Sequence, residues 1–87
     1  MLKEYRNILG EIILAERFSG SIEQKRRYHV KDKAVLGIEY RGNRWSIITI
    51  YGEELVFRGD WIVSVGSKRW VVKDDVFHNM YEEVETK

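Results

Sequence analysis

The strongest constraint on the fold is the order of turns and apolar runs in the C-terminal third of the chain. The apolar run 61–65 follows the turn-forming triplet Arg58-Gly59-Asp60, and Gly66-Ser67-Lys68 separates it from a second run, 69–73. Glycine supplies the positive φ angles of tight turns, and short runs rich in Val, Ile and Trp are typical of strands. The segment therefore predicts two strands joined by a tight turn.

A helix is predicted directly after this hairpin. Asp74 has the side chain of a helix N-cap. Phe77, Met80, Tyr81 and Val84 follow at spacings i, i+3, i+4 and i+7, which place them on one face of a helix. We expect this apolar stripe to pack on the sheet.

The remainder of the chain predicts further short elements. Ser21 stands three residues before Gln24, the spacing of a capping box, and Ile22 and Tyr28 are the expected anchors of the helix that follows. Gly52-Glu53 is expected to be a turn. The predicted segments are strands at 11–18, 34–40, 44–51 and 55–57, a helix at 22–29 and a turn at 41–43.

These elements predict one α+β domain over residues 1–87, with a small twisted antiparallel sheet of about five strands. Both faces of strand 44–51 are largely apolar, which favours a central strand covered on each side. The helix near 22–29 is expected at the surface, and the C-terminal helix is expected to pack on the sheet. A chain of 87 residues buries only about 60–65% of its unfolded surface, too little for two cores.

Composition narrows the possible chemistry. The chain has no cysteine, which excludes disulfides, thiolate metal ligands and thiol catalysis. It shows neither a signal-peptide pattern nor an apolar run of about 18 residues, so we expect a cytoplasmic protein without membrane contact. His29 and His78 have no cluster of further ligands near them, so no metal and no cofactor is expected.

Charge is distributed unevenly although the net charge is only +1. Residues 21–33 carry five basic and two acidic side chains, a local charge of +3. Such a basic face could bind the phosphates of a nucleotide or nucleic acid, or it could be the solvated face of a small helix. With the basic residues of the two predicted turns, its candidate members are Lys25, Arg26, Arg27, His29, Arg41, Arg44, Lys68 and Arg69.

An acidic face is predicted at the other end of the chain. Residues 74–87 carry five acidic side chains and one lysine, a local charge of −4. On a C-terminal helix, these carboxylates would suit a partner's nucleic-acid-binding groove. The candidate members are Asp75, Glu82, Glu83 and Glu85.

Aromatic residues have two interpretations. Trp45, Trp61 and Trp70 could stack on bases or fill the core. In so small a domain we expect Trp61 and Trp70 in the core and leave Trp45 open. Adjacent acids such as Glu82 and Glu83 point in different directions on a helix, and no serine has a matching His/Asp set. The sequence therefore predicts a protein without enzymatic activity and without catalytic residues.

The C-terminal half resembles small uncharacterised proteins encoded by bacteriophages and prophages. The resemblance rests on Gly59-Asp60 before an aromatic strand, on the glycine turn at Gly66, on Lys73, and on the Asp-x-Phe helix that ends in Tyr81-Glu82. The order of the segments before residue 24 also fits. The resemblance implies a phage origin and no established activity.

From the resemblance we hypothesise a phage protein that acts in the cytoplasm of the infected bacterium. It would bind a host protein stoichiometrically, plausibly an anti-phage defence component, and inhibit it. One alternative is an oligomeric sponge that sequesters a nucleotide immune signal through Arg26, Arg27, Arg41 or Arg44. A second is a nucleic-acid-binding regulator. A free edge strand could also support a homo-oligomer.

Overall fold

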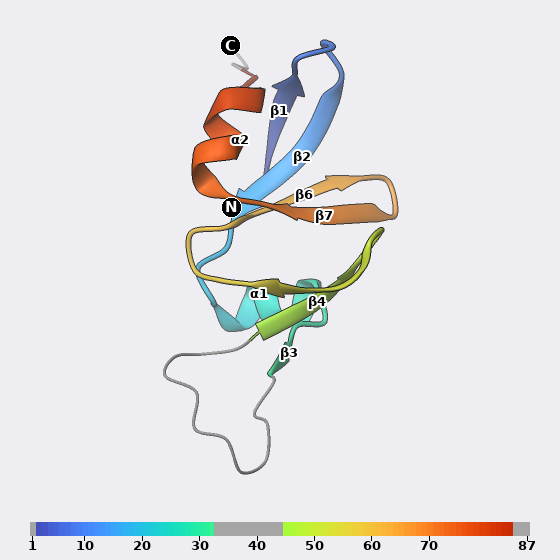
Figure 1. The fold of residues 1–87 in the computed structure, drawn as a ribbon, viewed down its shortest axis with the longest axis vertical. Helices are drawn as coiled ribbons and strands as arrows, with labels where there is room; N and C mark the ends of the chain where they lie inside the picture. The colour runs from blue at the N-terminus through green and yellow to red at the C-terminus, as the bar shows by residue number, and fades with distance from the viewer. Residues whose placement is uncertain (1, 33–44, 85–87) are drawn as a thin grey trace.

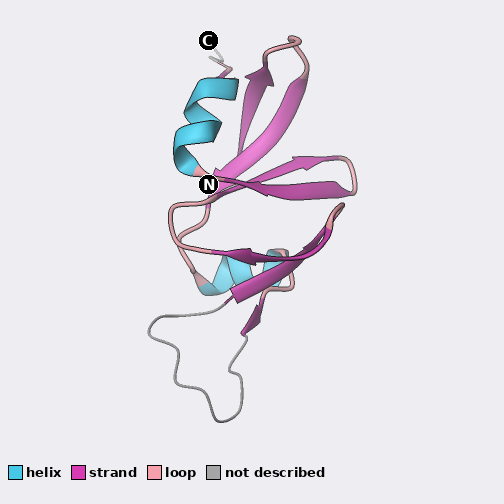
Figure 2. Ribbon diagram, in the orientation of Figure 1, coloured by secondary structure: helices cyan, strands magenta, loops and turns pink. Residues whose placement is uncertain are grey.

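The structure is a computed structural model that describes residues 2–32 and 45–84, and over these ranges it has an α+β fold with two helices and two antiparallel sheets (Figure 1, Figure 2). The predicted fold class is confirmed. Within the same ranges no helix is long and apolar enough to cross a membrane. The elements are β1 (Lys3–Asn7), β2 (Ile12–Arg17), α1 (Ile22–Arg27), β3 (Lys31–Asp32), β4 (Trp45–Thr49), β5 (Gly52–Val56), β6 (Trp61–Val65), β7 (Lys68–Val72), α2 (Asp74–Met80) and β8 (Tyr81–Glu83).

The larger sheet has five strands in the order β7-β6-β2-β1-β8. The hairpin β6–β7 forms where the sequence predicted it, with Val63 opposite Trp70. The hairpin β1–β2 joins it through pairing of β2 with β6, which places Ala15 opposite Val63. β8 pairs with the other side of β1, with Tyr5 opposite Glu83. The last described strand therefore lies beside the first (Figure 1).

The C-terminal helix is shorter than predicted, and its predicted cap is wrong. Lys73 occupies the N-cap position, and Asp74 is the first helical residue. The helix ends at Met80, because Tyr81 takes extended backbone angles and begins β8 opposite Asn7. Sheet hydrogen bonds to β1 thus replace the next helical turn. The predicted stripe is wrong after Phe77: Met80 is exposed, and Tyr81 contacts Phe77 from the strand.

The smaller sheet has the order β3-β4-β5, so β4 is its central strand in the described part of the chain. The predicted strand 44–51 is observed as Trp45–Thr49. Only part of its second face is covered, since Ser46 is buried but Ile48 is exposed. The turn predicted at Gly52-Glu53 lies two residues earlier, and Gly52, at φ +96°, already begins β5. The predicted strand 34–40 and turn 41–43 lie outside the described residues.

Helix α1 begins as the sequence predicted but is anchored differently. The Ser21 hydroxyl accepts a hydrogen bond from the Gln24 backbone amide at 3.2 Å, which confirms the expected cap. Ile22 is exposed, so it is not the anchor that we predicted. Gln24 and Tyr28 are buried instead. The Gln24 side chain accepts from the Ser19 amide at 2.7 Å and donates to the Arg17 carbonyl at 2.8 Å, tying α1 to the end of β2.

One hydrophobic core lies between α2 and the five-stranded sheet, and we call it the α2 core. Phe77 is its centre: its ring stacks on Trp61 at 3.9 Å between centroids and meets Tyr5 edge-on at 5.0 Å. Full burial of such side chains contributes roughly 1.5–3 kcal/mol each. The buried members are Ile13, Ala15, Trp61, Val63 and Phe77.

A second core joins the other face of this sheet to α1 and the small sheet, and we call it the α1 core. Ile62 reaches it because it alternates with Trp61 and Val63 along β6. Phe18 and Trp45 meet edge-on at 5.4 Å within it. The buried members are Phe18, Tyr28, Trp45, Ile47, Val56 and Ile62.

Candidate functional site

The most exposed large apolar side chains of the described residues lie at the tip of the β1–β2 hairpin. Ile8 is 77% exposed and Leu9 is 79% exposed. An apolar pair at a loop tip stabilises nothing in the isolated protein, because neither side chain is removed from water. Exposed apolar surface of this kind commonly marks a binding site.

The backbone of this tip is held in one conformation by Asn7. The Asn7 carboxamide oxygen accepts hydrogen bonds from the Leu9 amide at 3.0 Å and the Glu11 amide at 2.9 Å. Its carboxamide nitrogen donates to the Glu11 carboxylate at 3.2 Å, and its carbonyl accepts from the Gly10 amide at 3.0 Å. The loop therefore presents Ile8 and Leu9 from a preorganised turn.

A hollow of about 450 Å³ lies between this loop and the end of α2, and we call it the hairpin groove. The β1–β2 loop forms one wall, and the last turn of α2 with the start of β8 forms the other. Its apolar contributions include Ile8 and Met80, which is 41% exposed. The lining residues are Arg6, Asn7, Ile8, Gly10, His78, Asn79, Met80, Tyr81 and Glu82.

Charges beside the groove are balanced. Arg6 lies 3.7 Å from Glu82, and Lys3 lies 3.1 Å from Glu83. Both pairs connect β1 to β8 across the edge of the sheet and are about half exposed or more, so each contributes little to stability. Of the two pairs, only Arg6 and Glu82 line the groove, and there their charges balance.

The predicted acidic face does not form on a helix. Glu82 and Glu83 lie on β8, where consecutive side chains point to opposite faces of the sheet. Asp75 lies in the first turn of α2, and its carboxylate accepts from the Val76 amide at 2.9 Å. Glu85 lies outside the described residues. The prediction is wrong because α2 ends at Met80. The acidic residues after it therefore lie on a strand, where Glu83 pairs with Lys3 and Glu82 with Arg6.

The predicted basic residues are partly brought together. Lys25, Arg26 and Arg27 form the last turn of α1, and the exposed His29 follows at φ 51°. Arg69 of β7 joins this group, because its guanidinium carbon lies 5.7 Å from the Tyr28 ring centroid, and that of Arg27 lies 5.9 Å from the same centroid. Lys68 is exposed near the β6–β7 turn. Arg41 and Arg44 lie outside the described residues.

Arg27 has a structural partner that the sequence did not reveal. The Glu16 carboxylate is buried, accepts a hydrogen bond from Tyr28 Oη at 2.5 Å, and is in close contact with the Arg27 guanidinium. Burial alone would raise the pKa of Glu16, but hydrogen bonds from Tyr28, Arg27 and Gln24 outweigh burial and lower it. Burial and the hydrogen bond to Glu16 raise the pKa of Tyr28. Arg27 is thus occupied in binding a buried carboxylate.

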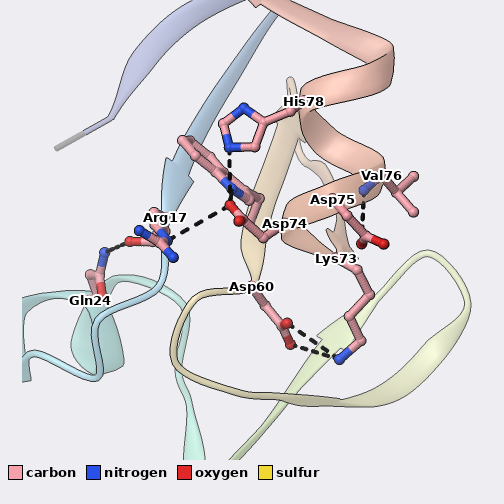
Figure 3. Close-up of polar contacts among 9 residues, drawn as sticks. Arg17, Gln24, Asp60, Lys73, Asp74, Asp75, Val76 and His78 are labelled. Atoms are coloured by element: carbon pink, nitrogen blue, oxygen red, sulfur yellow. Dashed lines mark hydrogen bonds and ion pairs between the residues drawn. The ribbon is translucent and has the colours of Figure 1, made fainter.

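Asp74, predicted as a cap, instead connects three segments (Figure 3). Its Oδ1 accepts from Trp61 Nε1 at 2.8 Å and lies 3.1 Å from His78 Nε2 and 3.9 Å from Arg17 Nε. The Trp61 indole hydrogen bond, helped by Arg17 and His78, lowers the pKa of the Asp74 carboxyl. His78 is exposed, as predicted, but this hydrogen bond fixes its ring beside Trp61.

Asp60 and Lys73, which belong to the resembled pattern, form an ion pair (Figure 3). Lys73 Nζ lies 3.2 Å from Asp60 Oδ2, and the same carboxylate oxygen accepts from the Phe57 amide at 2.9 Å. The buried Asp60 therefore fastens the β5–β6 turn to the start of α2. This contact gives both residues a structural role.

The tryptophans are used for packing. Trp45 and Trp61 are buried, and Trp70 is partly buried against the α2 core. The core positions expected for Trp61 and Trp70 are confirmed, and Trp45 also lies in a core. In residues 2–32 and 45–84 no group of three or more His, Asp or Glu side chains could hold a metal ion.

Comparison of the chain with models of protein families, with curated proteins and with solved structures finds no match.

The hairpin groove was not predicted from the sequence. Its signal is the pair Ile8-Leu9 between Asn7 and Gly10, where two aliphatic residues occupy a segment bounded by turn-forming residues.

Proposed function

We propose that this protein is a non-enzymatic binding protein that holds one protein partner through the hairpin groove and the apolar tip Ile8-Leu9. The observation that carries the proposal is an exposed apolar tip whose turn is hydrogen-bonded by the Asn7 side chain. Binding then removes about two aliphatic side chains from water without first ordering the loop, which lowers the entropic cost of association.

The chemistry of this surface favours a protein over a nucleic acid. Phosphate binding needs unpaired Lys or Arg side chains, but Arg6, which lines the groove, is paired with Glu82 of β8. Aliphatic side chains also make poor stacking partners for bases. The surface suits an apolar side chain of a partner, inserted beside Met80, with the amides and charges of the rim hydrogen-bonding around it.

The resemblance to small phage-encoded proteins supports a bacterial host protein as the partner, plausibly a component of anti-phage defence in the host cytoplasm. Inhibition would follow from occupancy of the partner's surface in a complex of fixed stoichiometry. Such inhibition requires no chemical step by this chain.

The test compares three forms of the tagged protein in host lysate. The first is the wild type, the second is Ile8→Ser/Leu9→Ser, and the third is the control Ile48→Ser/Leu55→Ser, which removes two exposed aliphatic side chains from the small sheet. We expect native mass spectrometry to show the same bound protein on the wild type and on the control, and none on the tip variant. The bound protein, once purified, should rebind at fixed stoichiometry in titration calorimetry.

Two results would overturn this function. One is a partner that the tip variant retains as strongly as the wild type. The other is a wild-type protein that carries no protein partner but only further copies of itself, because a self-association surface would then occupy the same edge of the molecule.

A further inference from the structure

A second surface, away from the hairpin groove, is built where two distant segments meet. Arg17 is the last residue of β2, residues 18–19 follow it, and residues 58–60 precede β6. The Phe18 amide donates to the Asp60 carbonyl at 2.7 Å, and the Gly59 amide donates to the Phe18 carbonyl at 2.9 Å. These two hydrogen bonds place Arg17 and Arg58 around a hollow of about 420 Å³, whose other lining residues are Phe18, Ser19 and Gly59. We call it the arginine hollow.

Two glycines with positive φ lie beside the arginines. Gly59 has φ +94°, and a side-chain carbon there would lie 3.5 Å from Nη2 of Arg17. Gly20 has φ +80°, and a side-chain carbon there would lie 2.7 Å from the Trp45 ring and 3.2 Å from Nε of Arg58. A larger residue at Gly20 would therefore collide with the aromatic ring beneath Arg58. The glycine makes room for this arrangement.

Trp45 also holds the cations in position. The guanidinium carbon of Arg58 lies 5.3 Å from the Trp45 ring centroid, and Nζ of Lys25 lies 4.6 Å from it. Both distances are in the range of cation–π attraction. Because the ring is buried, it is a rigid support. The same ring thus contacts Lys25 of α1 and Arg58 of the β5–β6 turn, and Arg58 lines the hollow together with Arg17 of β2.

Positive charge in this group exceeds the nearby negative charge. Arg17 has one acidic neighbour, Asp74, at 3.9 Å, which is already bonded to Trp61 and His78 (Figure 3). Neither Lys25 nor Arg58 has a carboxylate within ion-pair distance among the described residues. Two arginines therefore line the hollow, and the only acidic neighbour within ion-pair distance of either among the described residues is Asp74 beside Arg17, which leaves an excess of positive charge suited to an anion.

We propose that the arginine hollow binds the phosphate group of a small phosphorylated molecule, for which ADP is a suitable probe. Guanidinium groups match phosphate oxygens with pairs of N–H donors, and an ammonium such as that of Lys25 adds a point charge. Arg17 and Arg58 do not belong to the basic face predicted from the sequence. Their neighbour Lys25 does.

The test is an NMR titration of the ¹⁵N-labelled full chain with inorganic phosphate, ADP and adenosine. We expect phosphate and ADP to shift the Phe18, Ser19 and Gly59 amide signals saturably, and adenosine to leave them unchanged. Arg17→Gln/Arg58→Gln should weaken ADP binding by about tenfold or more, because it removes both donor forks. The control Arg26→Gln/Lys68→Gln makes the same change in net charge at two exposed sites and should weaken ADP binding by about twofold or less.

If loss of the Arg58 contact with Trp45 unfolds the protein, the single variant Arg17→Gln still tests the site. The Arg17 side chain is 60% exposed, so its substitution should leave the protein folded. The variant should weaken ADP binding while the spectrum stays dispersed. The proposal is overturned if no saturable shift occurs at the three amides, if the control weakens binding as much as the paired variant, or if a 5′-phosphorylated oligonucleotide binds more tightly than ADP.

Discussion

The α2 core and the α1 core pack on opposite faces of the same five-stranded sheet, and the buried carboxylate of Glu16 lies on the α1 side. On β2, Ala15 points into the α2 core, and the next residue, Glu16, points to the other face. The α2 core is closed by stacked rings around Phe77. Beside the α1 core, the carboxylate of Glu16 fixes Tyr28 and Arg27 by directed hydrogen bonds.

This difference separates two sources of structural order. Apolar burial, which holds the α2 core together, supplies free energy but little directional constraint. A buried carboxylate must have its donors in place, because an unsatisfied charge is costly. We infer that the Glu16 contacts determine how α1 sits against β2, and that the α2 core supplies more of the stability.

The largest effect is expected in the α2 core. Phe77→Ala should lower the free energy of unfolding by about 3–5 kcal/mol, because it leaves a cavity between Trp61 and Tyr81. Urea unfolding followed by tryptophan fluorescence measures the change. Val76→Ala on the same helix removes an exposed side chain and should cost about 0.5 kcal/mol or less. Equal losses in the two variants would show that α2 is not held by Phe77.

A smaller loss is expected at the buried charge. Glu16→Gln should lower the free energy of unfolding by about 2 kcal/mol, because Arg27 loses its carboxylate and the new amide has donors to satisfy. The loss stays below that of a fully buried pair, since the Arg27 side chain is 43% exposed and can be solvated. The matched surface change is Glu83→Gln, whose partner is Lys3, and it should cost about 0.5 kcal/mol or less. A Glu16 variant as stable as the Glu83 variant would remove the distinction between the two cores.

The pH dependence of this loss follows from the lowered pKa of Glu16. A carboxyl whose pKa is lower in the folded state stabilises the fold above its unfolded pKa, and that stability disappears as pH falls through the folded pKa. The ordinary pKa is 4.5, so the difference in unfolding free energy between wild type and Glu16→Gln should be full near neutral pH and should shrink below pH 4.5. Urea unfolding of both proteins at several pH values measures it. Asp74 is present in both proteins, so its contribution cancels in the difference. A difference that stays constant with pH would contradict the lowered pKa of Glu16.

The features that were predicted correctly are encoded locally. The turn at Gly66 and the runs around it predicted β6 and β7, and Ser21 with Gln24 predicted the start of α1. In each case the residues that determine the structure lie within a few positions of one another. The sequence was sufficient there because short-range hydrogen bonds and periodicity decide the outcome.

The features that were missed depend on distant partners. β1 is mostly polar, and it becomes a strand by pairing with β2 and β8. The end of α2 at Met80 depends on the same strand. In the sequence, Glu16 looks like a solvent-facing residue in an apolar run. In the structure, its hydrogen-bond donors are Arg27 and Tyr28, which lie 11 and 12 residues later in the chain. Arg17 and Arg58 meet only because β2 pairs with β6. Periodicity in a single sequence holds no signal for these contacts.

The smallest expected effect concerns the helix that carries Arg27 and Tyr28. Helix α1 has six residues, too few to be stable alone, so its cap and its side-chain contacts must hold it together. Ser21→Ala removes the acceptor for the Gln24 amide and should cost about 1 kcal/mol, whereas Ser21→Asp keeps an acceptor and should cost about 0.5 kcal/mol or less. Urea unfolding gives the free energies, and hydrogen exchange at the Gln24 amide shows whether the loss is local. If Ser21→Ala costs nothing, the contacts of Gln24, Arg27 and Tyr28 alone hold α1, and the buried carboxylate is a stronger organiser of this half of the molecule than the cap.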